Sequence, residues 1–483
     1  MRIAVKESQL GLRNSTTRIP FRYGTANLTR CPQAILRAVV ECDGARQEGF
    51  SGDCLPPSWF DKSPEKDYRR QIGDMLRVIG LAQAVYADAF ASGTEFFPAW
   101  LSCEEQIQQQ CRDWALPPLL ASFGSSLVER AILDATCRRH QVSFGRAVRD
   151  NLFGIDAGLV HEDLAGAAPR DWLPAEPLQA VHVRQTVGLI DPLSLDEVPP
   201  ADRLHDGWPQ AIEEYATRRG VRYYKVKVSN RLETDLDRLS RLAAILERHL
   251  GREYRLTLDG NEQYKRAEDF EGLVEAIRAR PDLRTLWEHV LVIEQPFDRA
   301  VALERGRVGG LRELSQAKPV IIDESDGTLD AFARAVDLGY RGVSSKNCKG
   351  AIRSILNAGL MWLHNDRGRR GDFVMTGEDL CTVGIVPVQS DLCLAATLGL
   401  EHVERNGHHY HPGLSYLPEA ERRAALAAHP DFYTEERSII GPRIDRGRFH
   451  IASLHCPGFG FAVAPDVSAM EPADTWRYES LGI

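Results

Sequence analysis

Residues 221–228 read VRYYKVKV, and residues 254–260 read YRLTLDG. Each is a short stretch of β-branched, aromatic and other apolar residues with charged residues at its end, which is typical of a buried strand. Amphipathic stretches long enough for helices separate seven such segments along the chain. The seven are VHVRQTVGL (181–189), VRYYKVKV (221–228), YRLTLDG (254–260), VLVIEQP (290–296), PVIIDES (319–325), RGVSSKN (341–347) and DFVMTGE (372–378).

This alternation of strands and helices favours a parallel sheet, and seven repeats favour a barrel over an open sheet. An eighth strand near residues 400–404 is less distinct. We therefore predict an α/β fold with a modified TIM barrel of the (β/α)7β type over residues 176–405. The chain of 483 residues is long enough for additional material beside a barrel of about 250 residues.

The residues before the barrel read as an α+β module. Residues 34–42 are apolar and β-branched, Asp43 and Gly44 form a hairpin signal, and residues 66–91 have helical periodicity. We place this module at residues 1–175. A C-terminal segment, residues 406–483, contains the helical stretch PEAERRAALAAHP and a turn-rich end.

Composition excludes several classes of protein. Hydrophobic residues make up 43% and charged residues 26%, which is the balance of a globular protein. The net charge is −9, and the arginine-rich stretch Arg367–Arg370 is short, so we expect no nucleic-acid partner. The sequence shows no signal peptide and no long apolar run, which predicts a cytoplasmic protein without a membrane partner. The 10 cysteines form no CxxC pair, so they indicate neither a zinc site nor a disulfide framework.

Polar and charged residues stand at the end of one predicted strand after another. Because the carboxyl ends of parallel strands meet at one end of a barrel, these side chains are expected to converge. A solvated lysine or a helix N-cap would explain any one of them, but not the whole set. The set is Lys225, Lys227, Asp259, Asn261, Glu294, Asp323, Lys346 and Glu378.

The three carboxylates Asp259, Glu294 and Asp323 follow three successive strands and supply hard oxygen ligands. Such ligands suit Mg²⁺, which keeps its remaining positions for water and substrate oxygens. Glu324 follows Asp323 directly and points to the opposite face, so only one of the two can be a ligand.

The lysines are candidates for proton transfer. Lys225 and Lys227 are two apart on a strand and face the same way, so the Lys225 charge is expected to lower the pKa of Lys227 toward that of a usable base. Lys346 reaches the site from the far side of the barrel. A substrate carboxylate on the metal would have its α-carbon between Lys227 and Lys346, and the metal would stabilise the enediolate formed on proton loss.

Five motifs in this order resemble the barrel motifs of the enolase superfamily, in the muconate-lactonizing-enzyme subgroup. They are KVK (225–227), DGN (259–261), EQP (294–296), DES (323–325) and SSKNCKG (344–350). The likeness extends outside the barrel. VERAILDATCRRHQVSFGRAVRDNLFG (128–154) is similar to the helix that leads into the family's barrel, PFRYG (20–24) to its capping-loop region and CPGFGFAV (456–463) to its closing segment.

The resemblance to mandelate racemase and muconate-lactonizing enzymes implies an N-terminal capping domain over the barrel, completed by the C-terminal segment. It implies Mg²⁺ on the three carboxylates and acid/base lysines at 227 and 346. It also implies that capping loops around Tyr23, Gly24 and residues 55–60 help to select the substrate. Residues 92–125 and 405–418 look like additions.

Other polar residues near the predicted site are less specific. Glu378 follows the seventh strand and is a candidate for substrate contact, although a helix cap explains it equally well. His408, His409 and His411 form a cluster that would suit a metal or substrate contacts, with His408 the candidate substrate residue. A solvated turn at the barrel end is the commoner explanation for such a cluster.

The leading hypothesis is a Mg²⁺-dependent racemase or epimerase that removes the α-proton of a small-molecule carboxylate. An acid-sugar dehydratase and a cycloisomerase use a compatible lysine pair, and the sequence does not separate these reactions. A hypothesis of another class is a non-catalytic metal-binding barrel, which predicts that a ligand or lysine is missing, whereas all five are present. We expect a homo-oligomer, since most soluble oligomers are symmetric assemblies of identical chains.

Overall fold

The computed structural model describes residues 1–23, 26–368 and 371–483. Gly24 of the predicted capping loop and Arg369 and Arg370 of the arginine-rich stretch lie outside the described residues. Across the described ranges, no helix has both the length and the apolar character needed to cross a membrane.

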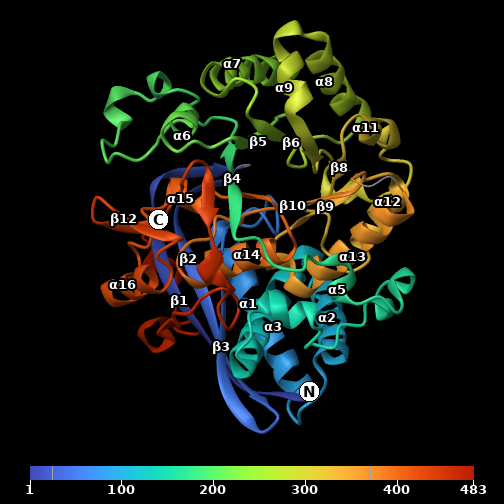
Figure 1. Cartoon of the computed structure of the whole chain (residues 1–483), viewed down its shortest axis with the longest axis vertical. Helices are drawn as coiled ribbons and strands as arrows, with labels where there is room; N and C mark the ends of the chain where they lie inside the picture. The colour runs from blue at the N-terminus through green and yellow to red at the C-terminus, as the bar shows by residue number, and fades with distance from the viewer. Residues whose placement is uncertain (24–25, 369–370) are drawn as a thin grey trace.

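The N-terminal module begins with an antiparallel sheet, drawn in blue in Figure 1. The turn between β2 and β3 is formed by Asp43 and Gly44, whose φ angles of 49° and 82° are those of a tight hairpin turn. Strand β15 of the C-terminal segment pairs with β1, so the two ends of the chain share one sheet. Its strands are β1 (Ile3–Tyr23), β2 (Ala26–Cys42), β3 (Ala45–Cys54) and β15 (Glu471–Pro472).

Helices cover one face of this sheet. The central helix α3 is buried along almost its whole length, because it packs against β3, against α1 and against the start of the barrel helix α13 (Ala351–Arg367). Glu129 on α3 accepts hydrogen bonds from the backbone N–H groups of Ala351 (2.7 Å) and Ile352 (3.3 Å) in the first turn of α13. The module therefore binds the barrel through a helix N-terminus. Its helices are α1 (Tyr68–Ala89), α2 (Phe96–Asp113), α3 (Pro118–His140), α4 (Phe144–Arg149) and α5 (Pro169–Trp172).

The second part is a nearly closed barrel of eight parallel strands, in the order β8-β7-β6-β5-β4-β11-β10-β9. A bridge between Ile322 and Val343 brings the end of β8 against β9. The predicted fold class is confirmed, including the indistinct eighth strand. The strands are β4 (Ala180–Val187), β5 (Tyr223–Lys227), β6 (Arg255–Asp259), β7 (Val290–Glu294), β8 (Val320–Ile321), β9 (Gly342–Ser345), β10 (Val374–Gly377) and β11 (His402–Glu404).

Helices surround the barrel, as Figure 1 shows for α7, α8 and α12. The amphipathic helix α7 buries Leu236, Leu239, Leu242 and Leu246, which recur at helical spacing along one face. The barrel helices are α6 (Ile212–Arg218), α7 (Leu232–Leu250), α8 (Ala267–Ala279), α9 (Arg284–His289), α10 (Arg299–Ala302), α11 (Leu311–Ala317), α12 (Ala331–Leu338), α13 (Ala351–Arg367) and α14 (Val386–Thr397).

The C-terminal segment returns to both parts. Strand β14 pairs antiparallel with barrel strand β4, and Phe459 stacks on Phe144 with ring centroids 3.8 Å apart. The backbone N–H of Phe459 also donates to Asp134 Oδ1 on α3 (2.7 Å). The segment comprises α15 (Gly407–Tyr410), α16 (Glu419–Ala428), β12 (Tyr433–Glu436), β13 (Ile439–Pro442) and β14 (Arg448–His450) before β15.

The close packing of β3 on α3 gives a testable prediction. A Cβ at Gly49 would overlap the backbone of Ala131 and Ala135, so Gly49→Ala should lower the free energy of unfolding by about 2–3 kcal/mol in urea denaturation. Gly73 is exposed on helix α1 with open space around it, so Gly73→Ala is the control and should be neutral or stabilising by about 0.5–1 kcal/mol. Equal effects of the two substitutions would contradict the tight contact between β3 and α3.

Candidate active site at the carboxyl end of the barrel

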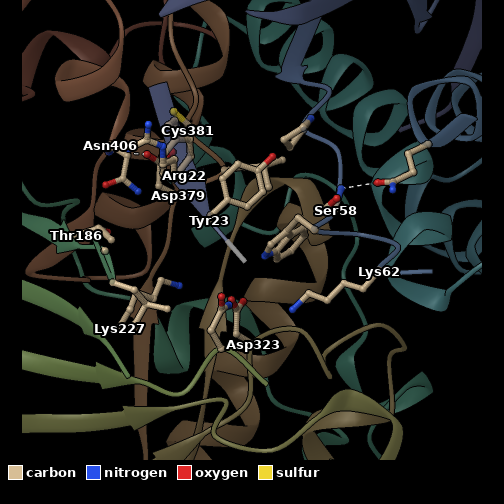
Figure 2. Close-up of a pocket in the computed structure, with 18 of the residues that line it drawn as sticks. Arg22, Tyr23, Ser58, Lys62, Thr186, Lys227, Asp323, Asp379, Cys381 and Asn406 are labelled. Carbon is tan, nitrogen blue, oxygen red and sulfur yellow. Dashed lines mark hydrogen bonds between the residues drawn. The ribbon is translucent and has the colours of Figure 1, made fainter. Parts of the chain in front are cut away.

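The predicted site residues come from the ends of successive barrel strands. Lys225 and Lys227 lie on β5, whose neighbour β6 ends in Asp259 opposite Lys227, and β7 ends in Glu294 opposite Asp259. Asp323 and Lys346 follow β8 and β9. The structure therefore brings the three predicted metal ligands and the three predicted lysines to one end of the barrel, as Figure 2 shows for Lys227 and Asp323.

Lys225 lies at the centre of these groups, buried among four carboxylates. Its Nζ donates to Glu294 Oε1 (2.7 Å), Glu378 Oε2 (2.7 Å) and Glu404 Oε2 (3.2 Å), and it lies 3.1 Å from Asp259 Oδ2. Burial alone would lower the pKa of this lysine, but the four carboxylates outweigh burial and hold the pKa well above its usual value. Lys225 is therefore a permanent ammonium ion that neutralises part of the carboxylate charge.

Lys227 lies closer to the cavity and contacts one carboxylate. Its Nζ donates to Asp259 Oδ2 (2.5 Å), the same oxygen that lies near Lys225, which confirms that the two lysines face the same way. Burial lowers the pKa of Lys227, Asp259 raises it and Lys225 lowers it, and the net effect is a rise. The sequence-based expectation of a lowered pKa was wrong for this arrangement, because it counted the second ammonium group and not the adjacent carboxylate.

Asp323 is held by two lysines. Lys346 Nζ contacts Asp323 Oδ2 (2.7 Å), whereas Lys349 Nζ contacts Oδ1 (2.9 Å) and the Asp323 backbone carbonyl (2.8 Å). Burial raises the pKa of Asp323, but the two ammonium groups outweigh burial and hold that pKa well below its usual value. Glu324 points the other way and accepts a hydrogen bond from Asn261 Nδ2 (2.7 Å), in line with the predicted alternation.

The three predicted metal ligands differ in how their oxygens are occupied. Within the described part of the chain, no three His, Cys, Asp or Glu side chains are arranged to hold a metal ion as they stand, and lysines contact all three predicted ligands. Glu294 Oε2, however, is buried without a hydrogen-bond partner among the described residues. Burial and the neighbouring Glu378 raise the pKa of Glu294 well above its usual value. A buried, unpaired oxygen in an all-carboxylate donor set fits a hard cation such as Mg²⁺.

A cavity of about 1090 Å³ opens above these residues. Its wall includes Lys225, Lys227, Asp323, Lys346 and Asn261 from the barrel end. The N-terminal module contributes the predicted residue Tyr23, whose hydroxyl donates to Pro57 O (2.7 Å), and part of the predicted loop 55–60. Figure 2 shows Tyr23 facing the side chains of Lys227 and Asp323 across this space. The predicted site residues of the barrel and the predicted capping residues therefore line the same cavity.

The structure places Glu378 and His408 differently from the sequence-based expectation, because neither lines this cavity. Glu378 lies deeper in the barrel, between Lys225 and Arg184, where it neutralises cations. His408 lies beside a separate cavity of about 20 Å³ and contacts Gln185 Oε1 (2.9 Å). His409 and His411 are buried as well, so the cluster is packed side chains and not a solvated turn. Burial lowers the pKa of His408 to about 3.

Three site residues were missed by sequence reasoning. Glu404 at the end of β11 lines the cavity and accepts from Thr186 Oγ1 and Lys225. Arg184 inside the barrel pairs with Glu378, and Lys349 pairs with Asp323. The available signal for Glu404 was a charged residue at the end of the indistinct eighth strand, directly after His402 and Val403. An arginine inside a strand was the signal for Arg184.

No protein-family model matches this sequence, and no curated protein matches it. Solved structures match over almost the whole chain. A mandelate racemase/muconate lactonizing protein from Herpetosiphon aurantiacus superimposes with a TM-score of 0.60 at 16% identity, covering 96% of this chain and 99% of that chain. A muconate lactonizing enzyme from Pseudomonas fluorescens, complexed with muconolactone, gives 0.57 at 16% identity, covering 97% and 99%. A dipeptide epimerase from Enterococcus faecalis, complexed with Mg and L-Leu-L-Tyr, gives 0.57 at 13% identity, covering 95% and 100%.

The position of Lys225 predicts a large effect on stability. Lys225→Met leaves four buried carboxylates without their shared cation and should lower the free energy of unfolding by about 3–5 kcal/mol at neutral pH. The loss should shrink as the pH falls, because protonation discharges the carboxylates. Lys6 forms a partly exposed pair with Glu41 (3.4 Å), so Lys6→Met is the matched control and should change stability by less than about 1 kcal/mol. Similar urea denaturation curves for both variants would refute the central role of Lys225.

The similarity to the solved structures rests on three-dimensional agreement, since the sequence identities of 13–16% are low. The agreement covers the N-terminal sheet with its helices, the barrel and the C-terminal segment together. The chain therefore has the fold of the enolase superfamily, as found in mandelate racemase and muconate lactonizing proteins.

Proposed function

We propose that this protein is a Mg²⁺-dependent enzyme that removes the proton next to the carboxylate of a small substrate. The observation that carries the proposal is the position of two lysines in one cavity. In the strand order, β5 and β9 have three strands between them in either direction, so Lys227 at the end of β5 and Lys346 after β9 stand opposite each other. A substrate between them presents one face of its α-carbon to each lysine.

Asp259, Glu294 and Asp323 are the residues that would hold Mg²⁺. They follow the three strands that lie between the two lysines on one side of the barrel. When bound, the cation would supply positive charge that stabilises negative charge on the substrate carboxylate as the α-proton leaves. The dipeptide epimerase with the same fold was solved with Mg, which supports this cofactor.

The remaining groups of the chain have distinct tasks in this proposal. One lysine takes the α-proton at its Nζ and the other returns a proton to the opposite face. Lys225 stays protonated and holds the carboxylates in place. Tyr23 and residues 55–60 close the cavity from the N-terminal module and exclude water from the reacting atoms.

Racemisation or epimerisation is the reaction that opposed lysines support best, because each face of the α-carbon has its own acid/base group. Dehydration of an acid sugar and cycloisomerisation use the same first step and differ in the fate of the deprotonated substrate. A neighbour in fold is a muconate lactonizing enzyme and another is a dipeptide epimerase, so the fold accommodates more than one of these outcomes. A non-catalytic barrel does not account for two lysines and a large cavity at the same strand ends.

The lysines provide the direct test. The protein with Mg²⁺ is incubated in D₂O with a panel of α-substituted carboxylates that includes dipeptides and hydroxy acids, and loss of the α-proton is followed by NMR. Lys227→Ala and Lys346→Ala should each reduce turnover by about 100-fold or more, as expected for a lost acid/base group. Lys318→Ala, a half-buried lysine over Trp287 away from the site, is the control and should keep full activity. Full activity in both site variants would overturn the mechanism.

The metal ligands have a test that does not depend on activity. Asp259→Asn and Asp323→Asn should each weaken Mg²⁺ binding by about tenfold or more in calorimetric titrations, because each removes a charged oxygen ligand. Asp43→Asn, in the hairpin turn between β2 and β3, changes the same charge far from the site and should bind Mg²⁺ as the unaltered protein does. Unchanged affinity in both site variants would refute the proposed ligand set.

Three further expectations stay predictions. They are the domain boundaries at 175/176 and 405/406, the cytoplasmic location and the homo-oligomeric state. Light scattering and size-exclusion chromatography of the purified protein measure the last of these.

A further inference from the structure

An aromatic ring from the N-terminal module lies against Lys346. The segment that follows β3 crosses from the sheet to the barrel end, and Trp59 in this segment lines the cavity. The Lys346 ammonium lies 4.2 Å from the centroid of the Trp59 ring. Both residues are buried, with 8% of Trp59 and 4% of Lys346 exposed, so the contact is shielded from water. A cation over the face of a tryptophan is attracted by the ring, most strongly where water is excluded.

The Lys346 ammonium thereby has two partners from different parts of the chain. Asp323 Oδ2 in the barrel accepts its hydrogen bond at 2.7 Å, and Trp59 presents its ring at 4.2 Å. A long, unbranched lysine side chain has many conformations, and each partner removes some of them. The two together fix where the Nζ atom stands relative to the cavity.

Trp59 is itself held by the barrel. Arg299 donates to the backbone carbonyls of Trp59 and Phe60, both at 2.9 Å, and makes a two-pronged ion pair with Glu262 (2.7 and 2.8 Å). Lys62 also contacts Glu262, at the Oε2 atom. Phe60 packs its ring edge-on against Trp59 with centroids 4.7 Å apart. The Trp59–Phe60 backbone is therefore tied to Arg299 at the start of α10 and, through Arg299, to Glu262 in the loop after β6.

We propose that Trp59 is a positioning residue for Lys346, and that the Arg299–Glu262 ion pair of the barrel holds Trp59 in place. Proton transfer on the Lys346 face of the substrate then depends on the N-terminal module, whereas transfer on the Lys227 face does not, because Lys227 is held by Asp259 of the barrel. This inference rests on the proposed function, in which Lys346 transfers a proton.

The test compares two substitutions of one residue. Trp59→Leu keeps an apolar side chain without an aromatic face, and Trp59→Phe keeps a face for the ammonium group. For a substrate found in the D₂O screen, α-proton exchange is measured separately for each enantiomer. Lys227→Ala and Lys346→Ala first establish which enantiomer depends on which lysine. If neither lysine variant affects one enantiomer more than the other, the proposed function fails at this step, before Trp59 is tested.

Trp59→Leu should slow exchange on the Lys346 face by about tenfold or more and leave the Lys227 face within about twofold. Trp59→Phe should recover most of the lost rate. An equal loss on both faces would overturn the proposal, since it would mean a general structural role. The same rates for Leu and Phe on the Lys346 face would also overturn it.

A second readout does not require activity. The rate at which a small amine-acylating reagent modifies Lys346 is measured by mass spectrometry, with Lys227 in the same sample as the reference. Removal of the ring in Trp59→Leu should increase the labelling of Lys346 by about threefold or more relative to Lys227, and Trp59→Phe should not. Increased labelling without a change in exchange would overturn the positioning role.

A variant on the barrel side covers the case in which Trp59→Leu does not fold. Arg299→Gln removes the charged group that holds the Trp59 backbone but keeps the indole ring. It should therefore also slow exchange selectively on the Lys346 face, by a smaller factor than Trp59→Leu does. Arg334→Gln, an exposed arginine on helix α12 beside Asp330, is the control and should leave both faces unchanged. A loss confined to the Lys227 face in Arg299→Gln would refute the proposed coupling.

Discussion

The site depends on the neutralisation of carboxylates at one end of a barrel. Asp259, Glu294, Glu378 and Glu404 are buried within reach of one ammonium group, Lys225. Buried like charges repel strongly where water is excluded, so such a cluster is stable only with cations among its members. Arg184, which pairs with Glu378, adds a second buried cation. These two cations stabilise the carboxylate cluster. Lys227 and Lys346, which line the cavity, each form an ion pair with one carboxylate among the described residues.

The strand order then divides the barrel end into two halves. Between β5 and β9 lie β6, β7 and β8 on one side and β4, β11 and β10 on the other. The first half carries the proposed ligands. The second half carries Thr186, Glu404 and Glu378, which bind Lys225 or one another. The proposed metal ligands and the other carboxylate partners of Lys225 therefore lie on opposite halves of the same ring of strand ends.

Features that depend on local pattern could be predicted from the sequence. Alternation along a strand placed Lys225 and Lys227 on one face and Asp323 and Glu324 on opposite faces, and the repetition of strands and helices predicted the barrel. The pairing of Lys225 with Glu404 could not be predicted, because that contact joins strands 179 residues apart and depends on how the barrel closes. The expected pKa of Lys227 was wrong for the same reason, since a neighbouring strand supplies the decisive carboxylate.

Residues that line the cavity were harder to predict than the charged groups at the strand ends. A buried histidine such as His408 and a cavity residue look alike in a sequence, since both are polar residues at a strand end, and only packing separates them. Trp59 shows the opposite case, an apolar residue of a connecting loop that reaches a lysine almost 300 residues later. This contact ties the N-terminal module to the barrel at Lys346, the proposed acid/base group. If Trp59 positions Lys346 as proposed, a change in that module alters more than the shape of the cavity, because it also moves a partner of Lys346.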